Sequence, residues 1–275
     1  MSTRDYLALM WQRRDFIAAV PLGELRAQNQ NTALGNVWHL LNPLLLAGVY
    51  YLVFGVLFDT RGGDYDNYAG YLIVGVFSFT YLNKATISGA RTVTSNRNLI
   101  QTIAFPRAAL PLSAVIVELL SQGYALMAML PLVWMTGTPP RWSWLLLPLA
   151  VAIQTIFNMG AAFFVARAAF HFADVQQVLP YIFRLWMYVS GLVFPLELIL
   201  RRTEPLGLHW VATVFQWNPA YLFISLWRTC VVGDVGPPVG AAPLWYWGAA
   251  LLWAVVILVT GFLWFRAHES EYAGG

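Results

Sequence analysis

Apolar residues fill six long stretches of the chain, and shorter polar segments separate them. A helix needs about 20 residues to cross a hydrocarbon layer roughly 30 Å thick. Every stretch is at least that long, so the pattern predicts an all-α membrane protein with six transmembrane helices. In chain order the stretches cover residues 38–58, 69–90, 110–136, 144–169, 179–200 and 244–265.

The composition supports this assignment. Hydrophobic residues make up 59% of the 275 residues and charged residues 11%, whereas an ordinary soluble domain has about 25% charged residues. A soluble core cannot hide this much apolar material, so lipid must surround it. We expect a cytoplasmic amphipathic interface helix in residues 1–36, a six-helix transmembrane domain in 37–265 and a short cytoplasmic tail in 266–275.

The distribution of arginine predicts the topology. Arginines lie before the first stretch, between the second and third, near the end of the fourth and after the sixth. Segments rich in arginine stay in the cytoplasm, and an even number of spans then places both termini there. We expect a multi-pass protein of the bacterial inner (plasma) membrane. The single cysteine, Cys230, excludes a disulfide within the chain.

Residues 4–33 place tryptophan and phenylalanine beside arginine. A helix with these residues on opposite faces lies in the membrane interface. Two interpretations remain open: an ordinary anchor next to the membrane, or an interface helix that also touches a cytoplasmic partner.

The loop between the second and third stretches predicts a short helix of its own. Thr94, Ser95 or Asn96 can cap its first turn, and Pro106 disfavours helical geometry at the residue before it. The product is one cytoplasmic helix of about ten residues that exposes apolar side chains. Such a helix needs cover from lipid or from another protein.

Residues 201–243 contain two apolar runs too short to span a membrane, separated by Asn218 and Pro219. Asparagine is a good N-cap and proline a good first helical residue. Two half-length helices that re-enter the outer leaflet fit this pattern, and we expect an outer gate at Trp217, Asn218 and Pro219. The alternative is a pair of helices lying flat on the outer surface.

Four ionisable residues fall within or near the apolar stretches. They are Lys84, Glu118, Arg184 and Glu197. Each would cost about 2.5–3.5 kcal/mol at the bilayer centre, so intramembrane charge is a functional candidate. Lys84 and Glu197 lie near the ends of their stretches and can extend to the interface. Glu118 and Arg184 lie deeper, and we expect them to pair with each other.

Aromatic residues also occupy the middle of three stretches. A protein that slides sugars needs weak, repeated sites, which flat aromatic faces provide. Packing against neighbouring helices explains the same residues equally well. The candidate channel and substrate residues are Tyr50, Tyr51, Phe54, Phe77, Phe79, Trp186 and Tyr188.

The chain lacks the motifs of a nucleotide-driven enzyme. A phosphate-binding loop ends in Gly-Lys-Ser or Gly-Lys-Thr, but Lys84, the only lysine, lies between Asn83 and Ala85. The four histidines are scattered without metal-ligand spacing. We therefore predict no catalytic residue, no metal site, no cofactor bound by this chain and no enzyme activity of its own. The energy for any transport must come from elsewhere.

Several short motifs resemble, in their order and spacing, the ABC-2-type permeases that export polysaccharides such as O-antigen and teichoic acid. The resemblance covers nearly the whole chain. The motifs are Leu34-Gly35-x-x-Trp38-x-x-Leu41-x-Pro43, Phe105-Pro106-Arg107, Phe172-x-Asp174, and Asn218-Pro219 followed by Arg228.

The resemblance implies partners and a mechanism. It implies a homodimer with a channel at the interface, embedded in membrane lipids, and two copies of a separate cytoplasmic ABC ATPase subunit that bind ATP and Mg. No nucleic acid is implied. The N-terminal helix and residues 96–105 would receive the ATPase stroke. The residues expected to couple the chain to the ATPase are Arg97, Asn98, Leu99, Phe105, Pro106 and Arg107.

The implied cargo is a lipid-linked polysaccharide. The choice of arginine over lysine is typical of a high-GC genome, so a galactan precursor of the cell wall is one cargo among several, beside O-antigen and teichoic acid. Two other functions remain open. One is an ABC-2 exporter of small hydrophobic drugs or lipids, and the other is an integral membrane transferase.

Overall fold

The computed structural model describes most of the chain, and every regular element in the described part is a helix. The predicted interface helix, the coupling residues Arg97, Asn98 and Leu99, and the side chain of Phe54 lie outside the described part. The described residues are 37–57, 67–96, 105–194, 196, 203, 207, 209–233, 244–269 and 271.

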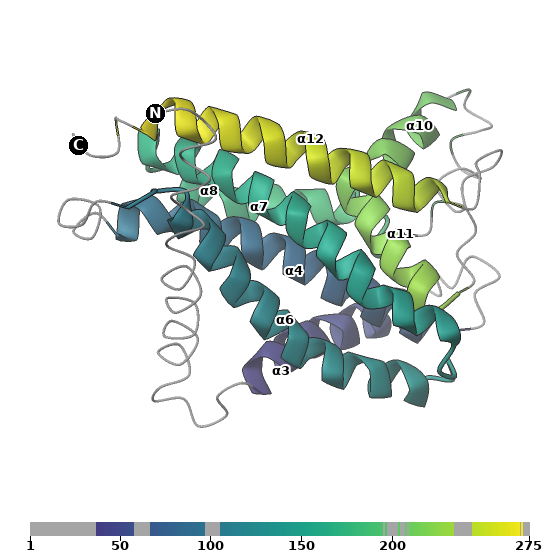
Figure 1. Cartoon of the computed structure of the whole chain (residues 1–275). Helices are drawn as coiled ribbons and strands as arrows, with labels where there is room; N and C mark the ends of the chain where they lie inside the picture. The colour runs from purple at the N-terminus through teal and green to yellow at the C-terminus, as the bar shows by residue number, and fades with distance from the viewer. Residues whose placement is uncertain are drawn as a thin grey trace.

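The long helices lie side by side in an elongated bundle (Figure 1). We call one end of the bundle the tail end: α4, α7 and α12 finish there, and α6 and α8 begin there. The other end is the opposite end. The helices are α3 (Val37–Tyr50), continued by a π-helix η1 (Tyr51–Leu57), α4 (Tyr68–Ser95), α6 (Ala109–Met135), a 3-10 turn η2 (Trp142–Leu146) leading into α7 (Leu147–His171), α8 (Val175–Tyr188), α10 (His209–Trp217), α11 (Pro219–Val231) and α12 (Trp245–Ala267).

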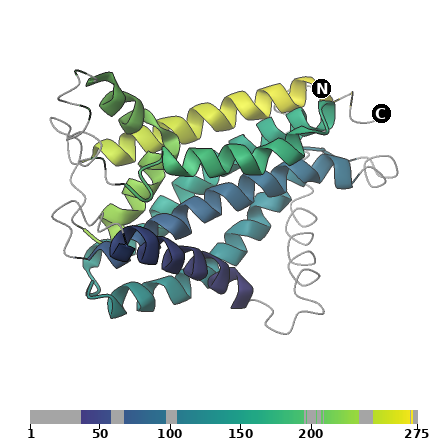
Figure 2. The same ribbon diagram turned by 180° about the vertical axis from the view of Figure 1, so that it is seen from behind.

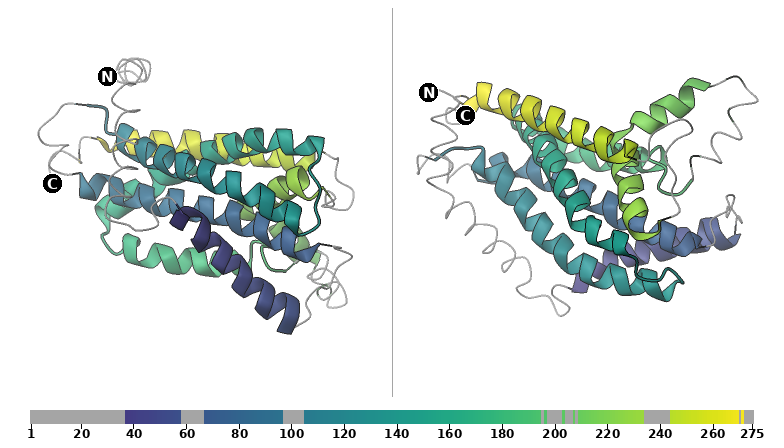
Figure 3. Two further views of the ribbon diagram at one scale, coloured as in Figure 1. Left: turned by 90° about the horizontal axis from the view of Figure 1, so that it is seen from below. Right: turned by 45° about the vertical axis from the view of Figure 1, so that its right-hand side comes forward.

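Helix α4 is the central element of the bundle. It contacts α3, α6, α7, α8 and α11, and α3 crosses the outside of the bundle obliquely beside it (Figures 2 and 3). Two polar side chains of α4 find partners on α7: the Tyr81 hydroxyl lies 2.8 Å from Thr155 Oγ1, and the Ser78 hydroxyl donates to Gln154 Oε1 at 3.4 Å. Buried polar groups need such partners.

Three helices of the described part are long and apolar enough to cross a membrane. They are Ala109–Met135, Trp142–His171 and Trp245–Ala267, and they coincide with the third, fourth and sixth predicted stretches. Leu41–Val53 is a shorter apolar helix. Helix α4 has 28 residues, about 42 Å at 1.5 Å per residue. Its length suffices, but its inward-facing polar residues reduce its hydropathy.

The fifth predicted stretch does not form one continuous helix. Instead of running over 179–200, α8 covers Val175–Tyr188, and the chain then turns through residues 189–194. Gly191 lies in this turn with φ 66°, a left-handed conformation that glycine adopts at little cost. With 14 residues, α8 is about 21 Å long, shorter than the hydrocarbon layer.

Helices α7 and α12 pack closely at two glycines. A Cβ atom on Gly261 would lie 2.4 Å from the carbonyl oxygen of Gly160, and a Cβ on Gly160 would lie 2.4 Å from the Ile257 backbone. Small residues let helix backbones approach within a membrane, where packing rather than the hydrophobic effect drives association. The two helices therefore form a tightly joined pair.

Replacing Gly261 by alanine should destabilise the protein, because the added methyl group meets the backbone of α7. Forcing a methyl group into a packed core costs about 1–3 kcal/mol. The measurement is the midpoint of thermal unfolding of the purified protein in detergent. Gly248→Ala is the matched control in the same helix, since nothing lies within 4 Å of its Cβ position. Equal midpoints for the two variants would contradict the close packing.

Candidate functional site

The guanidinium of Arg228, on α11, is completely buried at the opposite end of the bundle. Its Nε donates to the Tyr71 carbonyl at 3.1 Å, its Nη1 to the Gly191 carbonyl at 2.9 Å and its Nη2 to the Leu192 carbonyl at 2.7 Å. The guanidinium also lies over the Tyr71 ring, 3.3 Å from its centroid. One side chain thus joins α11, α4 and the turn after α8.

The break at the end of α8 explains why an arginine is needed there. The carbonyls of the buried turn that follows α8 lie outside any helix and need donors from elsewhere, and a guanidinium offers five donors in a rigid fork. The Tyr68 hydroxyl binds a further carbonyl of the turn, that of Val193, at 3.0 Å. On α4, Gly75 leaves room for the guanidinium, since a Cβ there would lie 2.5 Å from Arg228 Nη2.

Sequence reasoning did not assign Arg228 to a site. One signal was available: Arg228 is the only charged residue in the apolar run of residues 220–232. A charge in such a run indicates either a solvated face or a buried partner, and only the packing of three elements decides between them.

The predicted gate residues Trp217, Asn218 and Pro219 form the junction between α10 and α11. Asn218 caps α11, as expected from the sequence: its Oδ1 accepts from the Ala220 N–H at 3.1 Å. The same oxygen accepts from Trp186 Nε1 at 2.8 Å, and Nδ2 donates to the Val189 carbonyl at 2.7 Å. The α10–α11 junction is therefore bound to the end of α8.

Helix α12 holds the same junction from the other side. Trp253 Nε1 donates to the Trp217 carbonyl at 3.0 Å, and the Trp217 and Trp245 rings meet edge to face with centroids 5.0 Å apart. Both tryptophans that contact Trp217 belong to α12. The junction is thus fixed between α8 and α12.

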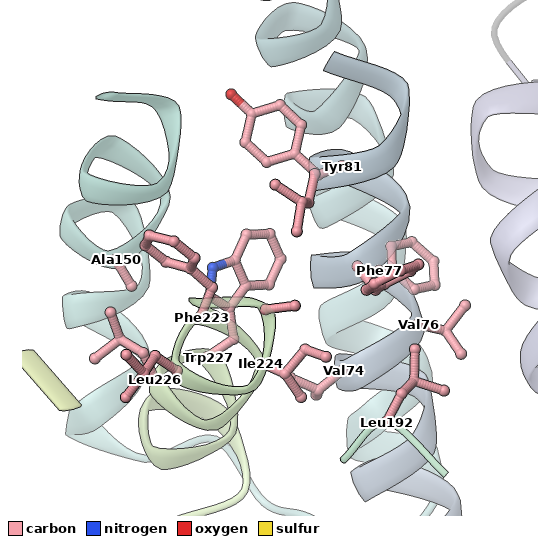
Figure 4. Close-up of a cluster of buried hydrophobic side chains, with 14 of the residues drawn as sticks. Val74, Val76, Phe77, Tyr81, Ala150, Leu192, Phe223, Ile224, Leu226 and Trp227 are labelled. Carbon is pink, nitrogen blue, oxygen red and sulfur yellow. The ribbon is translucent and has the colours of Figure 1, made fainter. Parts of the chain in front are cut away.

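The two short helices that meet at this junction differ in burial. Helix α11 enters the body of the protein, where its side chains Phe223 and Trp227 lie between α4 and α7 (Figure 4). Helix α10 is exposed, with Trp210 62% and Val214 58% accessible. Only one of the two predicted half-helices therefore packs inside the bundle.

Lys84 of α4 and Glu118 of α6 face a small cavity in the middle of the bundle. The cavity has a volume of about 10 Å³ and is also lined by Ser121, Gln122 and, from α3, Pro43. Ser121 Oγ and Gln122 Nε2 are buried and have no hydrogen-bond partner among the described residues. A polar space of this size holds about one water molecule.

The prediction that Glu118 pairs with Arg184 is wrong: within the described residues of one chain, the two side chains lie apart. Arg184 is exposed on α8, with its guanidinium 6.0 Å from the centroid of the Tyr181 ring. Helix α8 buries Leu179, Phe183 and Met187 on its other face, so Arg184 points away from the bundle. Glu118 lies beside Lys84 instead.

The candidate channel aromatics fall into three groups. Phe77 and Phe79 are buried in the core, and Phe79 meets Phe183 edge to face at 6.1 Å. Tyr51 and Tyr188 are exposed. Tyr50 and Trp186 join elements: the Tyr50 hydroxyl donates to Met187 Sδ at 3.0 Å, and Trp186 binds Asn218. Their role as channel residues stays a prediction.

Of the residues predicted to couple the chain to an ATPase, Phe105, Pro106 and Arg107 are described, and they lie at the tail end. Phe105 packs against an apolar cluster that includes Phe163 of α7 and Phe265 of α12, and Pro106 is buried. The Arg107 N–H donates to Glu269 Oε1 at 2.9 Å, and Arg107 Nη1 donates to the Glu269 carbonyl. Residues 105–107 are thus attached to the end of α12.

The side-chain contacts at these sites hold helices together. In the described part of the chain, no three residues among histidine, cysteine, aspartate and glutamate gather closely enough to hold a metal ion. The contacts described above bind carbonyls, cap a helix and join helix ends.

Comparison with known proteins identifies the family. Residues 20–231 match the family described as ABC-2 type transporter. The chain belongs to this family. The matched region contains Arg228, the α10–α11 junction and residues 105–107, so the described sites are parts of an ABC-2 transporter membrane domain.

Several curated proteins are similar to this ABC-2 chain over most of its length. An O-antigen export system permease protein RfbA from Myxococcus xanthus is 28% identical over 190 residues, 69% of this chain and 72% of the relative. Two proteins of the same name from Klebsiella pneumoniae are 25% identical, over 78% of this chain and 79% of the relative, and 24% identical, over 80% and 82%.

Replacing Arg228 by lysine should destabilise this ABC-2 chain, although the charge is retained. A lysine ammonium is a compact point charge and lacks the fork that reaches three carbonyls in two elements. Each lost hydrogen bond to a charged group is worth about 1.5–3 kcal/mol. The measurement is the thermal unfolding midpoint in detergent. Arg184→Lys, on the exposed face of α8, is the control, and equal midpoints would refute the role of Arg228.

Removing Lys84 and Glu118 together should cost less stability than the two single losses combined. In a single variant one charge would remain inside the bundle without the opposite charge beside it, whereas the double variant leaves neither charge. The comparison uses Lys84→Met, Glu118→Gln and both, with unfolding midpoints as the readout. We expect a coupling free energy of roughly 0.5–3 kcal/mol. As a control, the stability changes of Glu118→Gln and Arg184→Met should add up in the corresponding double variant. If the changes of Lys84→Met and Glu118→Gln also add up, the two residues are not coupled.

Proposed function

We propose that this chain is the transmembrane subunit of an ATP-driven exporter that moves lipid-linked polysaccharide across the plasma membrane. The observation that carries the proposal is the similarity, over 69–80% of the chain, to permeases of O-antigen export systems. A separate cytoplasmic ATPase subunit, present in two copies, binds ATP and Mg and supplies the energy. The cargo class is an O-antigen, teichoic acid or galactan-like glycan.

In this proposal the tail end of the bundle faces the cytoplasm. Arg91, Arg107, Arg167 and Arg266 all lie at that end. At the opposite end Arg141 is exposed, whereas Arg228 is buried and bound to carbonyls. Because arginine is retained on the cytoplasmic side, this asymmetry supports cytoplasmic termini. The six spans are then α3 with η1, α4, α6, α7, α12, and α8 together with the turn of residues 189–194 that follows it.

The exposed tyrosines of η1 and α8 support a channel between two copies of the chain. Tyr50 links α3 and η1 to α8 through Met187, and the neighbouring Tyr51 and Tyr188 are exposed. Flat aromatic faces offer a polysaccharide weak, repeated contacts along a path. A second copy placed against this surface would enclose the aromatic residues in a channel at the interface of a homodimer.

Transport is mechanical in this proposal. Closure of the ATPase pushes residues 96–105 from the cytoplasmic side, the transmembrane helices tilt, and the α10–α11 junction opens at the outer side. The firm attachment of residues 105–107 to α7 and α12 supports this route, because a displacement of that segment cannot leave those helices unaffected.

Replacing Arg97 and Phe105 together by alanine should uncouple ATP hydrolysis from export. The assay uses the chain in complex with its cognate ATPase in vesicles, and measures phosphate release and the polysaccharide that crosses the membrane. Phosphate release should continue, whereas transport should fall several-fold because the contact that transmits the stroke is weakened.

Two controls make this experiment decisive. Arg91→Ala, at an exposed position on α4, should leave export unchanged. The chain without its ATPase should release no phosphate. Unchanged export in the double variant would reject the coupling role. Hydrolysis by the chain alone would reject the proposed function, and transport of a hydrophobic drug in place of the polysaccharide would reject the proposed cargo.

A further inference from the structure

Two glutamates that follow α12 bind two other elements at the tail end. Arg167, in the last turns of α7, forms an ion pair with Glu271, with Nη2 and Oε2 2.7 Å apart. Glu269 accepts from the Arg107 N–H at 2.9 Å and, through its carbonyl, from the Arg107 guanidinium. We call these four residues, Arg107, Arg167, Glu269 and Glu271, the tail clamp.

The tail clamp differs from a solvated surface contact. The side chain of Arg167 is only 8% accessible, whereas that of its partner Glu271 is 47% accessible, so water reaches this ion pair from the glutamate side only and weakens it less than a fully exposed pair. Beneath the polar contacts lies the apolar cluster of Phe105, Phe163 and Phe265, in which the Phe163 and Phe265 rings lie 5.4 Å apart. Polar and apolar contacts thus join the same three elements.

Helix α12 connects the tail clamp with the α10–α11 junction. Its 23 residues span about 35 Å, and the helix runs along the whole bundle (Figure 1). Near its beginning Trp253 binds the Trp217 carbonyl, and the Tyr246 hydroxyl lies 3.3 Å from that of Tyr221 in α11. Helix α12 therefore makes contact at both of its ends. At the tail end it is joined to residues 105–107 through the clamp, and at the opposite end it contacts the α10–α11 junction directly.

We propose that Glu269 and Glu271 are positioning residues for transport: they carry a displacement of residues 105–107 over to α12 and α7, and α12 carries it to the α10–α11 junction. This inference rests on the proposed function, because it needs an ATPase stroke that acts on residues 96–105. Without the two glutamate side chains, residues 105–107 would be held on α7 and α12 only by the Phe105 contacts and the Glu269 carbonyl, and less of the displacement would reach the junction.

The test compares two variants of the full-length chain in complex with its cognate ATPase. The first, Glu269→Ala with Glu271→Ala, removes both side-chain contacts of the clamp. The second, Glu269→Gln, keeps a side-chain oxygen that can accept from the Arg107 N–H. For each complex, the amount of bound ATPase, the rate of ATP hydrolysis and the polysaccharide exported per ATP are measured in vesicles.

We expect the alanine variant to bind the ATPase and to hydrolyse ATP at rates within about twofold of the unsubstituted complex, with export per ATP reduced at least fivefold. Glu269→Gln should retain most of its export. Unchanged export per ATP in the alanine variant would overturn the proposal. Loss of ATPase binding would also overturn it, because the glutamates would then form a docking site rather than a transmission contact.

A measurement that does not involve transport separates this inference from the proposed function. Hydrogen exchange in the full-length chain, without the ATPase, reports directly on the Arg107 N–H. The alanine variant should exchange faster in the peptide that contains residues 105–110, and Glu269→Gln should not. Unaltered exchange in the alanine variant would refute the clamp itself. If the unsubstituted complex fails to export polysaccharide, the proposed cargo fails, and exchange still decides on the clamp.

Discussion

The fold depends on how the Arg228 guanidinium binds three backbone carbonyls inside the bundle. A broken helix in a membrane protein exposes polar backbone groups that lipid cannot satisfy. Here the break lies at the end of α8, and donors from α11 and α4 reach its carbonyls. The buried positive charge is costly by itself, so the arginine and the turn stabilise each other. Separating α11 from α8 would leave both without their partners.

This constraint also explains the composition of α4. The helix lies at the centre of the bundle and provides Tyr68, Tyr71 and Gly75 around the turn and the guanidinium. Farther along, Ser78 and Tyr81 bind polar groups of α7. A helix surrounded by protein can carry many polar groups because neighbouring helices satisfy them. For the same reason, its hydropathy is lower than that of the helices that face lipid.

The two ends of the bundle have different physical characters. The opposite end contains a buried guanidinium and a helix junction held by tryptophans, and the tail end contains an apolar cluster covered by ionic contacts. Helices α7 and α12, joined at Gly160 and Gly261, run between them as a pair. Such a pair can transmit force over its length, since backbone contact at the crossing prevents one helix from sliding freely past the other.

The sequence by itself determined the local features. It predicted the all-helical membrane fold, the third, fourth and sixth stretches, and the cap of α11 at Asn218, because hydropathy and capping depend on residues a few positions apart. The order of its short motifs indicated the family. Only the tertiary structure decided the burial of Arg228, the break after α8 and the placement of Glu118 beside Lys84 rather than beside Arg184. Arg228 and Tyr71 are 157 residues apart in the chain, and such contacts arise from the packing of whole helices, which no local pattern records.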